Sequence, residues 1–298
     1  MPKYLYLVDG TFELFRAHYA RRPDHVAPDG QPAKAAIGVV GTLLRLLQRD
    51  GEPATHLAAA FDNPIESFRN DLFDGYKTGE GIDPDIRSQF DLVEEGVAAL
   101  GVVVWSMDEW EADDALATAA VRWRDQCEQV RIMTPDKDLG QVVDGVRIIQ
   151  VDSIRRREID ETAVRARRVA PESIPDFLAL TGDPADGIPG LPGFGEKTSK
   201  VLLDAYGHIE EIPGDPTDWR VKVRGAEGLA KTLRTRREDA LLYRRLATLM
   251  TDVPLAESLA DLEWHGANRD ALTAWCERVG APQLATIPRR WRPSQPRS

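Results

Sequence analysis

Three carboxylates lie within four residues, at Glu111, Asp113 and Asp114, directly after Trp110. The segment that follows has helical periodicity, so we expect these residues to open a helix that runs to about Arg124. Glu111 and Asp114 are three positions apart and would share one face of that helix, and a bound ion could recruit Asp113, about 100° around the axis. The cluster is consistent with a cation site. It is equally consistent with acidic residues that stabilise a first helical turn through the helix dipole.

Other carboxylates follow predicted strands. Two β-prone segments, 3–8 and 55–61, end at Asp9 and Asp62, and a third, 130–133, leads into Asp136 and Asp138. Open α/β sheets place ligand chemistry at the carboxyl ends of their strands. Asp183 and Asp186 are three residues apart in a later loop, within reach of one ion. Donor sets of oxygen alone favour Mg²⁺ or Mn²⁺ over Zn²⁺, and the five histidines are scattered.

Strand and helix signals alternate through the first half of the chain. Further β-prone segments occur at 102–105 and 146–151, and amphipathic helical segments at 12–19, 33–49 and 85–100. This alternation predicts an α/β fold with a parallel sheet and helices on both faces. Residues 64–85 match no single period, and such a segment inside a domain is usually functional or disordered. After Arg157 the β signal stops, and the chain becomes helical and rich in loops.

A glycine-rich turn precedes one of the later helices. Gly190, Gly193 and Gly195 are followed by Lys197 and Thr198, and the helix is expected over 199–206. Glycine turns and helix-end amides form a concavity that binds anions. The spacing is not that of a Walker P-loop, and a helix precedes the turn, which suggests a helix-hairpin-helix that grips a DNA backbone. An ordinary helix connection with glycine caps is the alternative.

Composition excludes several classes of protein. The chain has two cysteines, no pattern of a signal peptide at its N-terminus and no apolar run of membrane-spanning length, so we expect a cytoplasmic protein. The net charge of -11 lies entirely in residues 1–150, whereas residues 151–298 are neutral overall. Basic residues gather there in runs at 155–157, 165–168, 220–224, 231–237 and 289–292. Together these runs suit a surface that follows a phosphate backbone, although each alone could be a solvated face.

Taken together, these segments resemble the 5′-nuclease (flap endonuclease) family, which includes the 5′→3′ exonuclease domain of bacterial DNA polymerase I. The similarity extends from Val8 to about Asp252 and rests on five pieces: 61–62, 111–114, 134–138, 181–186 and 192–198. It implies a PIN-like nuclease domain over 1–170 with a mostly parallel central sheet, a helix-hairpin-helix subdomain over 171–260 and a C-terminal extension over 261–298. Because no polymerase module follows in this sequence, a free-standing member is expected.

The resemblance assigns roles to nine carboxylates. Glu111, Asp113 and Asp136 would hold the ion that activates water, with support from Asp9, Asp62 and Asp114, while Asp138, Asp183 and Asp186 would hold a second ion. Two Mg²⁺ or Mn²⁺ ions about 4 Å apart can activate a water, neutralise the scissile phosphate and stabilise the leaving 3′-oxygen. So many carboxylates at one sheet edge would repel each other strongly without such cations.

The resemblance also implies DNA contacts. Residues 64–85 match the family's helical arch, in which Lys77 would neutralise the scissile phosphate and Tyr76 could stack on a base. Arg16 matches an arginine near the same phosphate. Gly190, Gly193, Gly195, Lys197 and Thr198 would bind the duplex, and a K⁺ ion could sit at that hairpin. Two departures occur: Glu80 stands where a second basic residue is usual, and Gly187 where Asn is frequent.

The sequence therefore predicts a monomeric, metal-dependent nuclease for DNA replication or repair that acts on flapped, nicked or 5′-ended duplexes. The alternative is a non-catalytic or weakly active paralogue that binds DNA structures. Retention of all nine carboxylates favours catalysis, since binding alone does not need them. A PIN-type ribonuclease is a third option that fits less well, because such proteins are usually shorter and lack the glycine hairpin.

Overall fold

The computed structural model describes residues 1–51 and 53–293 of the 298-residue chain. They form two compact units, each built from separated stretches of sequence. The first unit comprises Met1–Ile65, Gly79–Thr134 and Thr251–Ser298, and the second comprises Glu66–Thr78 and Pro135–Met250. The units thus interleave along the chain, whereas the domain boundaries expected from the sequence are contiguous.

The first unit is built on four parallel strands in the order β3-β2-β1-β4. They are β1 (Tyr4–Asp9), β2 (His56–Asp62), β3 (Val103–Met107) and β4 (Gln129–Met133). Val8 lies opposite both Ala59 and Met133 in the register. Strands buried on both faces read as apolar runs, and β1 and β2 do so until each ends in an aspartate. All four strands were expected from the sequence.

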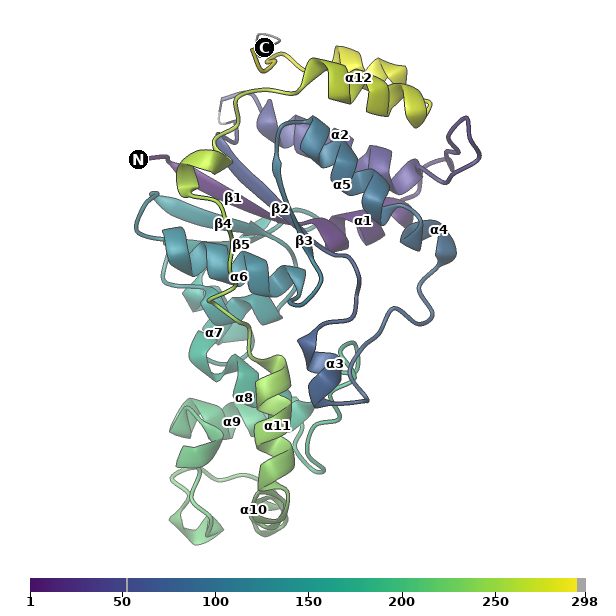
Figure 1. The fold of residues 1–298 in the computed structure, drawn as a ribbon. Helices are drawn as coiled ribbons and strands as arrows, with labels where there is room; N and C mark the ends of the chain where they lie inside the picture. The colour runs from purple at the N-terminus through teal and green to yellow at the C-terminus, as the bar shows by residue number, and fades with distance from the viewer. Residues whose placement is uncertain (52, 294–298) are drawn as a thin grey trace. The chain divides into compact units, whose positions relative to one another are not determined.

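Helices cover both faces of these strands, with α2 and α5 on one side and α6 on the other (Figure 1). The helices of this unit are α1 (Gly10–His18), α2 (Lys34–Leu47), α4 (Pro84–Arg87), α5 (Phe90–Ala99), α6 (Ala112–Trp123) and α12 (Arg269–Arg278), with 3-10 turns η5 (Leu259–Leu262) and η6 (Pro282–Thr286). The apolar face of α2 packs into the core with buried Val39, Leu43 and Leu47 at helical spacing. The helix expected over 85–100 is two helices, α4 and α5.

The described part of the C-terminal stretch belongs to the core of the first unit. Trp264 and Trp275 are buried and donate their indole N–H groups to the carbonyls of Leu100 and Leu92, both at 2.8 Å. A Cβ added at Gly96 would lie 2.6 Å from the Trp275 ring, so that helix must present a glycine there. Residues 261–293 are therefore tied to α5 by packing and hydrogen bonds.

The second unit contains an antiparallel pair of strands, β5 (Ile148–Asp152) and β6 (Arg157–Ile159). The prediction that β structure ends at Arg157 is wrong, because β6 begins there. This strand has only three residues and two of them are exposed, so it carries little apolar signal. Its pairing with β5 and the turn at Arg156, whose φ is 53°, create it.

Helices make up most of the second unit. They are α3 (Phe68–Leu72), α7 (Glu161–Arg167), α8 (Ile174–Thr181), α9 (Glu196–Tyr206), α10 (Ala226–Thr235) and α11 (Arg237–Ala247), with 3-10 turns η1 (Asp138–Val142), η2 (Pro171–Ser173), η3 (Ile209–Glu211) and η4 (Pro216–Asp218). Their core gathers Phe177, Leu202, Tyr243 and Leu246 from α8, α9 and α11. No helix within residues 1–51 and 53–293 is both long and apolar enough to cross a membrane.

Candidate metal centre

Asp9 is held at the junction of β1 and α1. It is the N-cap of α1, and one carboxylate oxygen accepts the Phe12 N–H at 2.8 Å. The other oxygen accepts the Thr134 hydroxyl at 2.8 Å, and Asp9 is only 6% exposed. A capping aspartate satisfies a backbone donor that the helix leaves open. The side chain is thus fixed where the first strand ends.

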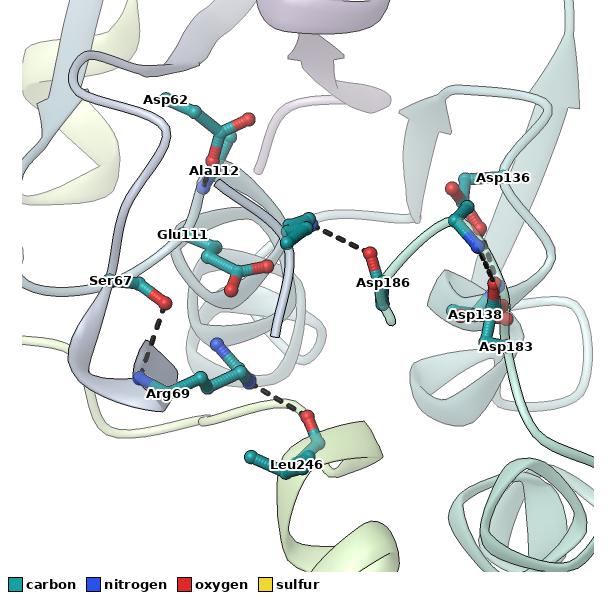
Figure 2. A network of polar contacts seen from close by, with 12 residues as sticks. Asp62, Ser67, Arg69, Glu111, Ala112, Asp136, Asp138, Asp183, Asp186 and Leu246 are labelled. Carbon is teal, nitrogen blue, oxygen red and sulfur yellow. Dashed lines mark hydrogen bonds and ion pairs between the residues drawn. The ribbon is translucent and has the colours of Figure 1, made fainter. Parts of the chain in front are cut away.

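Asp62 ties β2 to two other elements of the first unit. Its carboxylate accepts the N–H of Ala112, the first residue of α6, at 2.7 Å (Figure 2). Its own N–H donates to the Thr11 hydroxyl at 2.8 Å. The carboxyl ends of β1 and β2 and the start of α6 are therefore joined through this one residue.

Glu111 and Asp114 form a capping box at the start of α6. The Glu111 side chain accepts the Asp114 N–H, and Asp114 accepts the Glu111 N–H at 3.0 Å. Both residues are buried, Asp114 completely, while Asp113 is partly exposed. The helix-cap interpretation of this cluster is therefore correct. It does not displace the cation interpretation, because a carboxylate has two oxygens and several acceptor sites.

Four carboxylates of the expected set lie in the second unit. Asp136 accepts the Asp138 N–H at 2.8 Å, and Asp138 pairs with Arg168 at 2.8 Å. Burial raises the pKa of Asp138 to about 7. The charge of Asp136 adds to the rise, the Arg168 guanidinium opposes it, and the charge of Asp183 adds a smaller part. A desolvated carboxylate beside a second one, as Asp138 is beside Asp136, is stabilised by a bound cation.

Asp183 and Asp186 are carried by a tight loop after α8. Asp183 and Ile188 exchange two backbone hydrogen bonds of 2.8 Å, which close the loop. Asp183 also accepts the Ala185 N–H at 2.9 Å. Gly182 and Gly190 touch beneath it, because a Cβ on Gly190 would lie 2.4 Å from the Gly182 nitrogen. Glycine at these two positions therefore lets the loop fold back on itself.

Lys77 binds this loop twice. Its ammonium lies 3.0 Å from an Asp186 carboxylate oxygen, and its backbone N–H donates to the Asp186 carbonyl at 3.0 Å. Tyr76 is 3% exposed and packs in the core of the second unit. The stacking role expected for Tyr76 does not fit this geometry, because the ring is buried and presents no face to a passing base.

Arg16 is engaged within α1. Its guanidinium donates to Glu13, with one contact of 3.1 Å, and to the Thr42 hydroxyl at 3.4 Å. Glu13 is 4% exposed, so the pair is anchored on its acidic side. Glu13 is not among the site residues predicted from the sequence, because a single acidic residue in a first helical turn does not indicate a functional role.

The glycine turn leads directly into α9, which starts at Glu196, earlier than expected. Gly190 and Gly193 have φ values of 71° and 90°, and Gly195 is the N-cap. Lys197 and Thr198 consequently lie in the first turn, whose amides have no partner within the helix. This is the local arrangement that binds anions at helix starts.

Comparison with known proteins identifies the chain. The model of the 5′-3′ exonuclease N-terminal resolvase-like domain matches residues 4–168, and that of the 5′-3′ exonuclease C-terminal SAM fold matches residues 169–270. The chain belongs to the 5′-3′ exonuclease family. The resemblance inferred from the sequence is thereby confirmed, and the chain is a member of a family of hydrolytic nucleases.

Curated relatives of this exonuclease-family chain are DNA polymerases. DNA polymerase I of Pseudomonas aeruginosa is 38% identical over 280 residues, which cover 91% of this chain and 30% of that protein. DNA polymerase I of Bacillus caldotenax is 32% identical over 285 residues, covering 94% and 32% respectively. The chain thus spans about a third of the length of these relatives.

Solved structures share the fold. T5 5′-exonuclease with bound divalent metal ions (zinc) has a TM-score of 0.64 at 17% identity and covers 95% of this chain and 100% of its own. The catalytic core of Rad2 in complex with DNA substrate has a TM-score of 0.60 at 14% identity, with coverage of 96% and 90%. The predicted PIN-like α/β fold followed by a helical subdomain is therefore confirmed.

The nine carboxylates of this exonuclease-family chain divide five and four between the two units. No group of three or more His, Cys, Asp or Glu side chains within residues 1–51 and 53–293 is gathered in a metal-binding arrangement. Some of them form ion pairs with basic side chains instead: Lys77 pairs with Asp186, and Arg168 pairs with Asp138. The donor set, with oxygen alone and a raised pKa at Asp138, nevertheless fits a hard divalent cation.

Replacing Gly187 by alanine tests how the Asp186 loop meets residues 75–77. Gly187 has a φ of 75°, and its Cβ would lie 2.0 Å from the Gly75 carbonyl oxygen. We expect Gly187→Ala to lower the free energy of unfolding by about 2 kcal/mol or more, since the left-handed conformation alone costs about 1 kcal/mol for alanine. Thermal and urea unfolding would measure the loss.

Gly225→Ala is the matched control for this prediction. Gly225 has a φ of 76°, and nothing lies within 4 Å of its added Cβ. It should therefore lose only the backbone contribution, about 1 kcal/mol. Equal losses for the two variants would show that the contact between Gly187 and Gly75 does not matter. The clash also accounts for the glycine at position 187 of this chain.

Proposed function

We propose that this chain is a divalent-metal-dependent 5′→3′ exonuclease and flap endonuclease that acts on DNA. The observation that carries the proposal is the pairing of Asp136 and Asp138 on one loop, where burial first and the charge of Asp136 second raise the pKa of Asp138 to about 7. Placing a buried carboxylate beside a second one costs stability, and a protein that only bound DNA would have no use for this arrangement. Mg²⁺ or Mn²⁺ at these carboxylates would remove this cost, and the same ion chemistry can activate a water against a phosphodiester.

The carboxylates of the chain would hold the ions in two groups. Glu111, Asp113 and Asp136 would hold the ion that activates water, with Asp9, Asp62 and Asp114 in support. Asp138, Asp183 and Asp186 would hold the second. The capping interactions of Asp9, Asp62 and Glu111 support this role, because they fix each side chain at a strand end or helix start.

Lys77 and Arg168 would act before and during the reaction. Each pairs with a carboxylate of the second group, at 3.0 and 2.8 Å. We propose that they keep those carboxylates neutralised until cations take their place. Lys77 released from Asp186 would then be available to the scissile phosphate, and Arg16 would assist there.

DNA would be held by the start of α9 and its glycine turn. Exposed Lys197, partly buried Thr198 and the open amides of that turn suit a phosphate backbone. A K⁺ ion at this turn belongs to the same proposal. Solved relatives support it in part, since a T5 D15 flap endonuclease structure and the Rad2 core are described in complex with DNA.

Cleavage assays with labelled flapped, nicked and single-stranded DNA test this function. We expect products with Mg²⁺ or Mn²⁺ and none when a chelator is present, because the carboxylates alone cannot activate a water. The assay should use purified protein, and chelated samples should recover activity when the metal is restored. Binding of flapped DNA without products in either metal would favour the alternative, a DNA-structure-binding paralogue with no catalysis.

A further inference from the structure

The second unit contains a cavity of about 500 Å³, and only Lys197 and Arg168 of its lining have a role in the function proposed above. It is lined by the loop 135–137 and by residues of β5, β6, α7, α8 and α9, all within that unit. Seven Lys and Arg side chains line it against one carboxylate, Glu196. Ligand sites typically have volumes of about 300–1,000 Å³, so this cavity is large enough for a small organic molecule.

Three of these cations have no counterion among the residues that the structure describes. Within residues 1–51 and 53–293, the side chains of Lys137, Arg167 and Lys197 make no hydrogen bond or ion pair. All three are exposed at the cavity. Uncompensated like charges around one concave site repel each other and focus a positive potential into it. An anion is therefore the partner that this part of the lining accepts.

The other four cations are held in place by the protein. Arg155 and Arg157 both bind buried Asp152, at 3.1 and 3.2 Å. Lys200 pairs with Asp204 at 3.2 Å. Arg168 pairs with Asp138 and lies over the Phe177 ring, 5.6 Å from its centroid. The lining thus combines a fixed set of cations with a set that is available for a ligand.

The inner part of the cavity is apolar. Ile159, Val164, Ile174 and Phe177 line it and are almost completely buried. Inorganic phosphate has no apolar surface that could pack against these side chains. A ligand that joins an anionic group to a flat, largely apolar body satisfies both parts of the site.

The cavity also shares a wall with the candidate metal centre. Pro135 and Lys137, which flank Asp136, line it, and the Gln150 side chain in its wall donates to the Asp136 carbonyl. Arg168, also in the wall, holds Asp138. A molecule in the cavity would contact the loop that carries two of the expected metal ligands.

From these contacts we infer that the cavity binds a nucleoside 5′-monophosphate. Lys137, Arg167 and Lys197 hold the phosphate, and the apolar lining receives the base. The choice of this ligand class rests on the proposed function, because a 5′ nuclease releases products that carry a 5′-phosphate. Its place beside the Asp136 loop makes it a site at which released nucleotide remains next to the carboxylates.

Binding measured in chelator tests this inference without any cleavage. Isothermal titration calorimetry would compare deoxyadenosine 5′-monophosphate with deoxyadenosine and with inorganic phosphate. We expect the nucleotide to bind at least about tenfold more tightly than either part, since only it fills both parts of the cavity. Equal affinity for inorganic phosphate and the nucleotide would overturn the inference.

Two charge reversals assign the site. Arg167→Glu should weaken nucleotide binding by at least about tenfold, because it removes a charge-assisted hydrogen bond and adds repulsion. Arg224→Glu changes the same charge at an exposed position of the same unit that does not line the cavity, and it should have little effect. Arg167 has no partner in the described chain, so its loss should leave the unfolding temperature unchanged. Equal weakening by both variants would contradict the site.

The 5′-phosphate could belong to a released mononucleotide or to the end of a DNA strand. Binding of a 5′-phosphorylated tetranucleotide distinguishes these two sources. Binding of the tetranucleotide but not of the mononucleotide would mean that the cavity belongs to a DNA strand, and the inference would be wrong. A chain that binds the mononucleotide but never cleaves DNA would disprove only the proposed function. A chain that cleaves DNA but ignores the mononucleotide would disprove only this site.

Discussion

Asp136→Asn is expected to lower the rate of metal-dependent DNA cleavage by about a thousandfold, which corresponds to about 4 kcal/mol of transition-state stabilisation. Asparagine is neutral and a poorer ligand for a hard cation. It keeps a side-chain oxygen that can accept the Asp138 N–H, as Asp136 does at 2.8 Å. The variant therefore removes charge with little change in local structure.

Two measurements separate this effect from a general defect. Single-turnover cleavage of a labelled flap in Mg²⁺ gives the rate, and binding of the same DNA in chelator should stay close to that of the unmodified chain. Asp218→Asn removes the same charge from an exposed aspartate of η4 in the same unit and should cleave normally. A normal rate for Asp136→Asn would show that the metal assignment is wrong.

Arg69→Ala should be the most destabilising single substitution that we predict, with a loss of about 3–5 kcal/mol. Arg69 is 1% exposed, and its guanidinium donates to the Leu246 carbonyl at 2.8 Å (Figure 2). It also donates to the Thr248 carbonyl at 2.9 Å. These carbonyls end α11, where a helix leaves acceptors without partners. Alanine would leave the carbonyl of buried Leu246 without this donor, beside the space that the guanidinium had filled.

Urea and thermal unfolding would measure this loss. Arg87→Ala is the matched control, because Arg87 is exposed on α4 and its loss should change the free energy of unfolding by less than about 0.5 kcal/mol. Arg69→Lys should recover only part of the stability, since an ammonium lacks the planar fork of the guanidinium. A small effect of Arg69→Ala would mean that residues 66–78 are held by other contacts.

The sequence by itself determined the four strands of the first unit, three of its helices (α1, α2 and α6) and the acidic residues that follow those strands. Asp9 and Asp62 end apolar strands, and Glu111 to Asp114 open a helix. These features depend on residues close together in the chain, so local periodicity and capping preferences reveal them. The family could also be inferred from short segments, because their order and spacing along the chain can be read directly from the sequence.

Only the tertiary structure decided how the later half of the chain uses its charges. Arg69 and Tyr76 lie in a segment expected to face DNA, yet their side chains are buried against α11 and the core of the second unit. Arg168 stands in a basic run, and its partner Asp138 lies 30 residues earlier. Composition cannot tell a solvated charge from a buried or paired one, because the difference depends on contacts made across the fold.

The glycines and the cationic cavity make the same point. The need for glycine at Gly187 comes from the Gly75 carbonyl, more than a hundred residues away in sequence. The cavity gathers cations from the loop after β4, from α7 and from α9, and no local pattern predicts that Lys137 and Lys197 line the same cavity. The local sequence shows which residue types are present. Long-range packing decided which of them are structural, which are paired and which face a ligand.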